Sequence, residues 1–192
     1  MKYINEHFTQ TLEVKQSKFI AHLVPFSEYE SALEELKREH PKARHFVCAY
    51  RYLNEYDQVM EYSTDDGEPK GTSGKPSLMV LQGADIINSA VIIVRYFGGT
   101  KLGTGGLVRA YSDAVNLVLS SSTLLEYKKE DTVEISFEYT DLRRIEYECS
   151  IYDIDIVEKR FEEQTVYRLK ADKETMQEFL NKIDRMISIL NR

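Results

Sequence analysis

The sequence predicts an α+β protein made of two domains, and three observations support this prediction. Strand and helix patterns follow one another in the order β-β-α-β-β-α-β-α in the first part of the chain and β-α-β-β-α in the second. All nine glycines and all four prolines lie before Ser112, so the composition changes between the two parts. A charged stretch, residues 126–131, separates them. We therefore expect an N-terminal domain over residues 1–128 and a C-terminal domain over residues 129–192.

Local patterns place the elements of the first domain. Ser27 and Glu30 have the spacing of a capping box, so a helix should follow Ser27 and end by Pro41. Pro76 is typical of the first turn of a helix, and Gly83 of the residue just after one. In chain order we expect strands 9–14 and 19–24, the helix after residue 27, strands 43–53 and 58–63, helix 76–83, strand 90–96 and helix 104–120.

The second domain shows fewer elements. The alternating run 133–139 predicts a strand, and residues 142–152 have helical spacing. A hairpin is expected from 154–159 and 166–171 through residues 161–163, followed by an amphipathic helix over 176–187. This order is that of a ferredoxin-like domain without an obvious last strand.

Composition excludes several classes of function. The 192-residue chain carries a formal charge of −7, so unselective binding to nucleic acid or anionic membrane is not expected. Cys48 and Cys149 lie in apolar patterns typical of buried, reduced thiols. Residues 1–8 are polar, and no apolar run approaches the roughly 20 residues that cross a bilayer. We expect no signal peptide, no membrane contact and a cytoplasmic location.

A glycine-rich turn follows the last strand of the first domain, in VIIVRYFGGTKLGTGGLVRAYSDAV, residues 91–115. Glycine lets another group approach the main chain, and the first amides of the next helix have no partner within that helix. Arg95, Lys101 and Arg109 surround this turn. Together these features predict a site for an anion, most simply phosphate.

The turn matches neither standard nucleotide-binding motif. Thr104 stands where a P-loop requires lysine, and Val108 stands where the dinucleotide motif requires its third glycine. A tight turn packed against a neighbouring strand, with solvated cations, therefore remains an alternative.

A second loop, TDDGEPKGTSGKP at residues 64–76, also points to function. It lies between a strand and a helix, and long structureless loops inside domains are usually functional. Residues 67–109 carry a charge of +3 within a chain of −7. The candidate ligand- or anion-binding residues are Lys70, Thr72, Lys75, Arg95, Gly98, Gly99, Lys101, Gly103, Thr104, Gly105, Gly106, Arg109 and His45.

The sequence predicts no catalytic residue, metal site or cofactor. His45 could donate a proton or bind phosphate, although a strand histidine packed beside its neighbours is common. Asp65, Asp66 and Glu68 could bind a hard metal ion, although Asp–Gly is itself a turn signal. No spacing predicts a catalytic triad or dyad.

The two loop segments, DDGEPKGTSGKP and VRYFGGTKLGTGGLVRAYSDA, resemble those of the IMPACT/YigZ family. SKF at 17–19 and RHFVCAYR at 44–51 fit the same family, and the resemblance runs from about Phe8 to Ser120. It implies a first domain like the second domain of ribosomal protein S5. The rest of the chain is similar to the C-terminal domain of bacterial members, itself like the last domain of elongation factor G.

The resemblance implies a role in translation or ribosome binding, and together with the charge of +3 over residues 67–109 it favours a non-catalytic regulator. Its expected partners are the ribosome, RNA, a translation factor or a phosphate-like anion bound through the glycine-rich loops; a reader of DNA sequence is not expected. Eukaryotic relatives carry an additional domain, so their partner is not carried over. Two alternatives stay open: an enzyme acting on a small phosphorylated ligand, and a protein–protein adaptor that docks through the C-terminal part, whose charge from Asp131 onward is −5.

Overall fold

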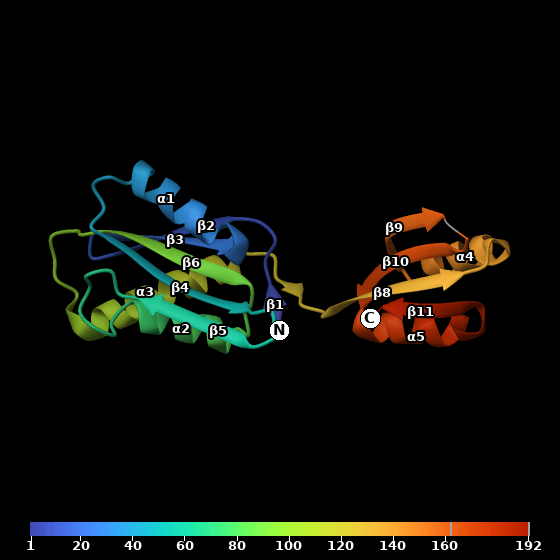
Figure 1. Cartoon of the computed structure of the whole chain (residues 1–192). Helices are drawn as coiled ribbons and strands as arrows, with labels where there is room; N and C mark the ends of the chain where they lie inside the picture. Colours follow the sequence, from blue (N-terminus) through green and yellow to red (C-terminus); the bar gives the residue numbers. More distant parts are fainter. Residues whose placement is uncertain (162, 192) are drawn as a thin grey trace. The chain divides into compact units, whose positions relative to one another are not determined.

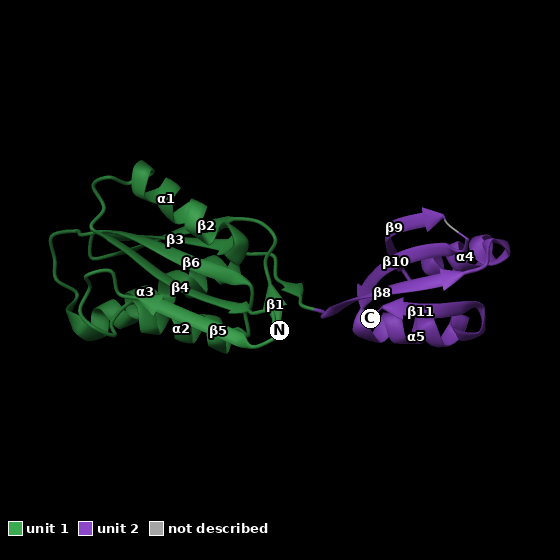
Figure 2. Ribbon diagram, viewed as in Figure 1, with its two compact units in different colours: residues 1–127 green, residues 128–192 purple. Residues whose placement is uncertain are grey.

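The computed structural model describes residues 1–161 and 163–191, which form a mixed α/β protein of two compact units. Unit 1 comprises Met1–Tyr127 and unit 2 comprises Lys128–Arg192 (Figure 2). The boundary falls inside the charged stretch at residues 126–131. The predicted α+β composition is confirmed.

Unit 1 is built on a five-stranded antiparallel sheet with the strand order β2-β3-β6-β4-β5 (Figure 1). A small second sheet pairs the start of the unit with its end. The strands are β1 (Lys2–Tyr3), β2 (Phe8–Val14), β3 (Ser17–Pro25), β4 (His45–Leu53), β5 (Val59–Thr64), β6 (Ser89–Tyr96) and β7 (Leu125–Glu126).

Helices cover both faces of this sheet. The helices α2 (Gly74–Gly83) and α3 (Gly103–Ser120) pack on one face, and α1 (Tyr29–Glu39) packs on the other (Figure 1). The central strand β6 is consequently buried from Ser89 to Arg95. Burial on both faces explains why its sequence is almost continuously apolar instead of alternating.

The glycine-rich turn after β6 packs against the β2–β3 hairpin. A Cβ atom on Gly98 would lie 2.0 Å from the carbonyl carbon of Gln16, so no side chain fits there. The Gly98 amide donates to Ser17 Oγ at 3.1 Å, which fixes the close approach. At Gly98, therefore, the alternative interpretation of the turn is correct: this glycine serves packing.

Unit 2 has a four-stranded antiparallel sheet in the order β11-β8-β10-β9, with two helices over one face. Its core includes Val133, Ile135, Tyr167 and Phe179. The elements are β8 (Glu130–Phe137), α4 (Leu142–Ile151), β9 (Asp155–Phe161), β10 (Thr165–Asp172), α5 (Lys173–Ile183) and β11 (Ile187–Asn191).

The structure corrects three sequence predictions. The capping box at Ser27 is wrong, because a short 3₁₀ turn (Phe26–Glu28) precedes α1 and no side chain caps that helix. The helix predicted over 176–187 ends at Ile183, and Ile187 begins β11, the strand that the pattern did not reveal. Gly83 is the last residue of α2 and not the residue after it.

Two smaller predictions have different outcomes. Cys48 and Cys149 are buried and free, as predicted; burial is the main cause that raises the pKa of Cys48 to about 11 and that of Cys149 to about 12. The turn predicted at 161–163 includes residue 162, which lies outside the described residues.

We predict that Gly98→Ala destabilises unit 1 by about 1–3 kcal/mol, because the added methyl group would overlap the backbone of the β2–β3 turn. Urea unfolding would measure the change. The matched control is Gly105→Ala, because no heavy atom lies within 4 Å of the new Cβ position and the φ of Gly105 is outside the left-handed region. Equal stability of the two variants would contradict the packing role of Gly98.

Candidate functional site: two glycine-rich loops and a buried charge cluster

The loop at residues 64–73 is organised by the carboxylate of Asp65. Its Oδ1 atom accepts from the amides of Ser73 (3.1 Å) and Gly74 (2.8 Å) and from Ser73 Oγ (2.7 Å), and its Oδ2 atom accepts from the amide of Gly71 (2.7 Å). Burial raises the pKa of Asp65, but the combined effect of these hydrogen bonds lowers it by more. The pKa of Asp65 therefore lies below its ordinary value. The N-terminus of α2 thus already holds an anion, supplied by the chain itself.

The three acidic residues of this loop do not form a metal site. Asp66 Oδ2 accepts from the Phe46 amide at 2.6 Å, which ties the loop to the start of β4. Asp65 faces α2, and Glu68 points into the unit toward Arg95. Among the described residues, no group of three or more histidine, cysteine or acidic side chains could hold a metal ion.

Glu68, Arg95 and Tyr111 form a buried charge cluster. Glu68 Oε1 accepts from Arg95 Nη1 and from the Tyr111 hydroxyl, the latter at 2.9 Å. The side chains of Glu68 and Arg95 are 4% and 7% exposed. Burial and the nearby Glu68 carboxylate raise the pKa of Tyr111, so the phenol stays protonated and donates to Glu68.

Arg95 is also held by aromatic rings. Its guanidinium carbon lies 5.3 Å from the centre of the Phe19 ring and 5.9 Å from the centre of the Phe97 ring. Its Nε atom is buried and has no hydrogen-bond partner among the described residues. The charge of Arg95 is therefore balanced by Glu68 and is not a free cation for a ligand.

His45 borders this cluster. Its Nδ1 atom lies 2.7 Å from the carbonyl oxygen of Asp66, and because a carbonyl only accepts, Nδ1 carries a proton. The Nε2 atom faces Glu68 Oε1 at 3.9 Å, with the His45 side chain 23% exposed. The histidine therefore presents its second nitrogen at the edge of the charge cluster.

A hollow of about 340 Å³ opens in front of α3, above the charge cluster. Positive φ angles at Gly99 (89°) and Gly103 (73°) turn the chain around it. Its lining is part charged and part apolar: Glu68, Pro69, Arg95, Phe97, Lys101, Leu102, Gly103, Thr104 and Leu107. We refer to it as the α3 hollow.

The two helix starts differ in one respect. Asp65 occupies the start of α2, whereas at α3 the N-cap residue Leu102 makes no capping hydrogen bond. Within the part of the chain that the structure describes, no other side chain accepts from the first-turn amides of α3. These amides and the helix dipole therefore favour an acidic group from outside.

The α3 hollow brings together only part of the predicted site. Arg95, Lys101, Gly103 and Thr104 line it, while Gly105 and Gly106 lie in the first turn of α3. Lys101 is the exposed cation in the lining, because Arg95 is paired with Glu68.

Other predicted residues lie elsewhere. Lys70, Lys75 and Arg109 are exposed and do not line the α3 hollow. Thr72 is buried and its Oγ1 donates to the Pro69 carbonyl at 2.6 Å, so it stabilises its own loop. The predicted convergence of Arg95, Lys101 and Arg109 on one anion is not found: Arg109 does not line the α3 hollow, and Arg95 is paired with Glu68.

Sequence reasoning missed the charge cluster. Glu68 stands between Gly67 and Pro69 in an irregular loop, where no periodicity indicates which side chain turns inward. Tyr111 lies within the predicted helix 104–120, and its hydroxyl is the one sequence signal that a buried acceptor is needed there.

In unit 2, ion pairs occupy the sheet face opposite the helices. On the sheet face opposite its helices, Glu134 Oε1 accepts from Arg168 Nη2 at 2.8 Å and from Arg160 Nη2 at 3.2 Å. Lys170 forms a further ion pair with Glu130 at 2.5 Å. The cations of this face are therefore balanced by its own acids. None of the described helices, in either unit, is long and apolar enough to traverse a bilayer.

Comparisons with known proteins agree with the resemblance. The family model described as the Impact N-terminal domain matches residues 15–119 of the chain. An "IMPACT family member" of Haemophilus influenzae is 35% identical over 175 residues, which cover 89% of this chain and 84% of the relative. "IMPACT family member YigZ" of Escherichia coli is 34% identical over 174 residues, or 89% and 85% of the two chains. A crystal structure described as a hypothetical protein is 30% identical, with a TM-score of 0.71 and coverage of 100% and 96%.

We predict that Glu68→Gln destabilises unit 1 by about 3–5 kcal/mol, because it leaves the Arg95 charge buried without its partner. Thermal and urea unfolding would measure the loss. In the double variant Glu68→Leu/Arg95→Met, both charges are removed, and much of the stability should return. If the double variant is as unstable as the sum of its single variants, the two side chains are not coupled.

We predict that Asp65→Asn removes part of the acid dependence of stability. The pKa of Asp65 is lowered in the folded state, so its contribution is fully present above the ordinary value of 3.8 and is lost as the pH falls through the lower, folded pKa. Urea unfolding of both proteins at neutral pH and near pH 3 should show a smaller acid-induced loss for the variant. An identical loss in both proteins would show that Asp65 makes no such contribution.

Proposed function

Because the chain belongs to the IMPACT family, we propose that it is a non-catalytic regulator associated with translation, acting in the cytoplasm, and that the α3 hollow receives an acidic group of its partner. That partner is the ribosome, through RNA phosphate or an acidic side chain of a ribosomal protein. The proposal rests on family membership together with the chemistry of the hollow.

One observation carries the choice of an acidic group. In the same unit, two glycine-rich loops lead into two helices, and the first helix start is filled by the carboxylate of Asp65. The second has free amides, the exposed Lys101 in its lining and an open approach. The carboxylate of Asp65 at the start of α2 thus shows, within the same unit, the kind of group that the start of α3 favours.

Gly105 adds support from a different direction. Glycine in a helix costs about 0.5–1 kcal/mol relative to alanine. Neither a positive φ nor a close neighbour requires glycine at position 105. A partner that approaches the first turn of α3 closely would account for the missing side chain.

The neutralised Arg95 limits the size of the contact. With Arg95 paired to Glu68, the contact depends on main-chain amides and Lys101, which suits one or two phosphates and not a long stretch of backbone. RNA affinity should therefore fall only shallowly with salt: the slope of log affinity against log salt concentration should be roughly −0.7 to −0.9 for each phosphate contacted.

A second candidate function is an enzyme acting on a small phosphorylated ligand. The α3 hollow of about 340 Å³ lies at the lower end of the range for small-molecule sites, and His45 faces Glu68, one of the lining residues. A thermal-shift screen with nucleotides and sugar phosphates distinguishes it, since a ligand at 100 times its Kd stabilises a protein by about 2.7 kcal/mol. An adaptor role for the acidic unit 2 is the third candidate.

We also propose the finer fold assignments. Unit 2 has the element order β-α-β-β-α-β and the strand order β11-β8-β10-β9, which support a ferredoxin-like domain. For unit 1, the resemblance supports an assignment to the second domain of ribosomal protein S5.

We predict that the chain co-sediments with ribosomes and that Lys101→Glu reduces the bound fraction at least several-fold, because it places a carboxylate beside the open start of α3. Lys37→Glu is the matched control: it makes the same charge change on the exposed surface of α1 and should bind like the wild type.

Two outcomes of this experiment would reject the proposal. In the first, no co-sedimentation occurs at low or moderate salt. In the second, both lysine variants lose binding equally, which would show a general charge effect instead of a specific contact.

A further inference from the structure

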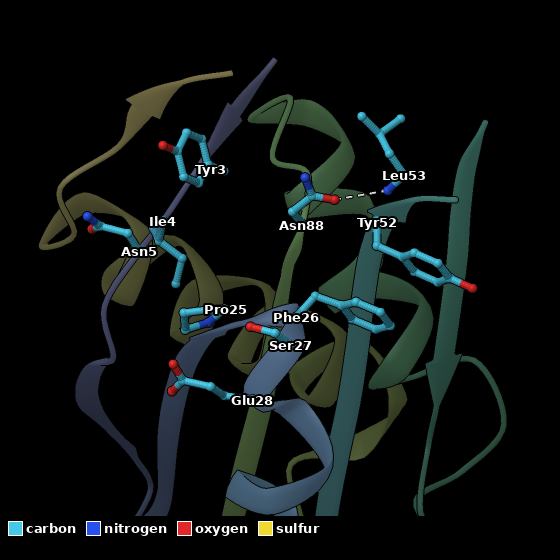
Figure 3. Close-up of a pocket in the computed structure, with 10 residues that line it drawn as sticks. All are labelled: Tyr3, Ile4, Asn5, Pro25, Phe26, Ser27, Glu28, Tyr52, Leu53 and Asn88. Atoms are coloured by element: carbon cyan, nitrogen blue, oxygen red, sulfur yellow. Dashed lines mark hydrogen bonds between the residues drawn. The ribbon is translucent and has the colours of Figure 1, made fainter. Parts of the chain in front are cut away.

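A second pocket lies in unit 1, outside the glycine-rich loops. It has a volume of about 580 Å³. Figure 3 shows that four segments supply its lining: residues 3–5, residues 25–28, residues 52–53 and Asn88. It lies at the end of the sheet where β3 and β4 finish and β6 begins. We refer to it as the Phe26 pocket.

Aromatic rings form one wall of the Phe26 pocket. The rings of Phe26 and Tyr52 stack at 4.1 Å with an angle of 4° between their planes. Tyr3, Ile4 and Pro25 add a further ring and aliphatic surface to the lining (Figure 3). Phe26 also stacks on Tyr29, at 6.5 Å with an angle of 7° between the planes. The wall is therefore a set of stacked rings, whose apolar surface suits the stem of a long side chain.

Glu28 is the one charged side chain among the lining residues. The other polar side chains are neutral: those of Tyr3, Asn5, Ser27, Tyr52 and Asn88. Within the described chain, no hydrogen bond or ion pair engages the Glu28 carboxylate. An anionic ligand would be repelled here, and a neutral apolar ligand would remove water from Glu28 without replacing it. An aromatic and aliphatic lining with one unpaired carboxylate matches a cation on an apolar stem.

The aromatic surface continues from this pocket onto the edge of the sheet. Met60 of β5 lies directly opposite Tyr52, and Tyr62 stacks on Tyr50 at 5.1 Å. Met60 and Tyr62 are 41% and 46% exposed, and β5 is an edge strand. An edge strand with exposed apolar side chains can pair with an extended segment of another chain.

We propose that the Phe26 pocket binds an arginine side chain of a partner polypeptide, whose flanking apolar residues lie on Met60 and Tyr62. The aliphatic stem of the arginine packs on the aromatic wall, and its guanidinium pairs with Glu28. The planar fork of guanidinium donors suits a carboxylate better than a lysine ammonium does. This contact does not depend on the α3 hollow or on the function proposed for it.

Titration of the ¹⁵N-labelled full chain tests the pocket. The probe is N-acetyl-arginine amide, and its control is N-acetyl-citrulline amide, which has the same shape without the charge. We expect saturable amide shifts at Ile4, Leu53 and Asn88 with the arginine probe, and at least tenfold weaker binding of citrulline. Equal binding of the two probes, shifts that map elsewhere, or no saturable shift would overturn the proposal.

Matched variants test the role of Glu28. Glu28→Gln should weaken the arginine probe at least tenfold, whereas Glu34→Gln, the same change on an exposed position of α1, should leave it unchanged. Equal effects of the two variants would overturn the assignment of Glu28.

A peptide tests whether the bound arginine belongs to a polypeptide. Acetyl-Val-Arg-Val-amide should bind at least tenfold more tightly than the arginine probe alone, and Tyr62→Ser should remove this gain without changing binding of the single amino acid. If the peptide binds no more tightly than the arginine probe, the proposal that the arginine belongs to a polypeptide is wrong. Loss of ribosome binding in Lys101→Glu would leave all of these outcomes unaffected.

Discussion

The buried ion pair between Glu68 and Arg95 is the contact on which the arrangement of unit 1 depends. It joins the middle of an irregular loop to the end of the central strand β6, and the Tyr111 hydroxyl extends it to α3. A buried pair is not by itself a large source of stability, since removing two charges from water offsets most of their attraction. Its role is positional: either charge alone would be costly, so the loop, the strand and the helix are held in one arrangement.

The same pair decides how the local charge should be interpreted. The sequence gives residues 67–109 a charge of +3, which suggests several free cations at one site. In the structure, Glu68 balances Arg95, and Arg109 lies outside the α3 hollow, so Lys101 and main-chain amides remain. A sum of charges along a segment gives the sign of a surface. It does not identify which charges reach a ligand, because that depends on where each side chain turns.

Regular elements of this chain were predictable for physical reasons, and the irregular ones were not. The helix at α3 and the strand at β6 follow from periodic apolar positions that bury one face or both. The strand β11 was missed because Met186 and Ile187 continue the helical spacing of α5 past its end at Ile183. The capping box failed at Ser27 because a 3₁₀ turn and Pro25 fix the entry to α1 differently. The site was harder still, since Asp65 and Glu68 act through tertiary contacts that leave no periodic signal.

Glycine content alone also conceals distinct causes. Gly98 is required by the backbone of Gln16, Gly99 and Gly103 by positive φ, and Gly105 by neither. Only Gly105 suggests contact with a partner, because neither backbone conformation nor packing within unit 1 requires glycine there.

The two candidate sites of unit 1 lie at opposite ends of β6 and have opposite chemistry. Asn88, just before β6, borders the Phe26 pocket with its single carboxylate, and Arg95, near the end of β6, lies beneath the α3 hollow with its free amides. Seven steps of extended chain lead from Asn88 to Arg95, a span of roughly 23 Å. That distance and the opposite charge preferences mean that one group cannot satisfy both sites. A partner with an acidic group and a separate arginine-bearing segment could engage both ends at once, and each contact would then raise the effective concentration of the other.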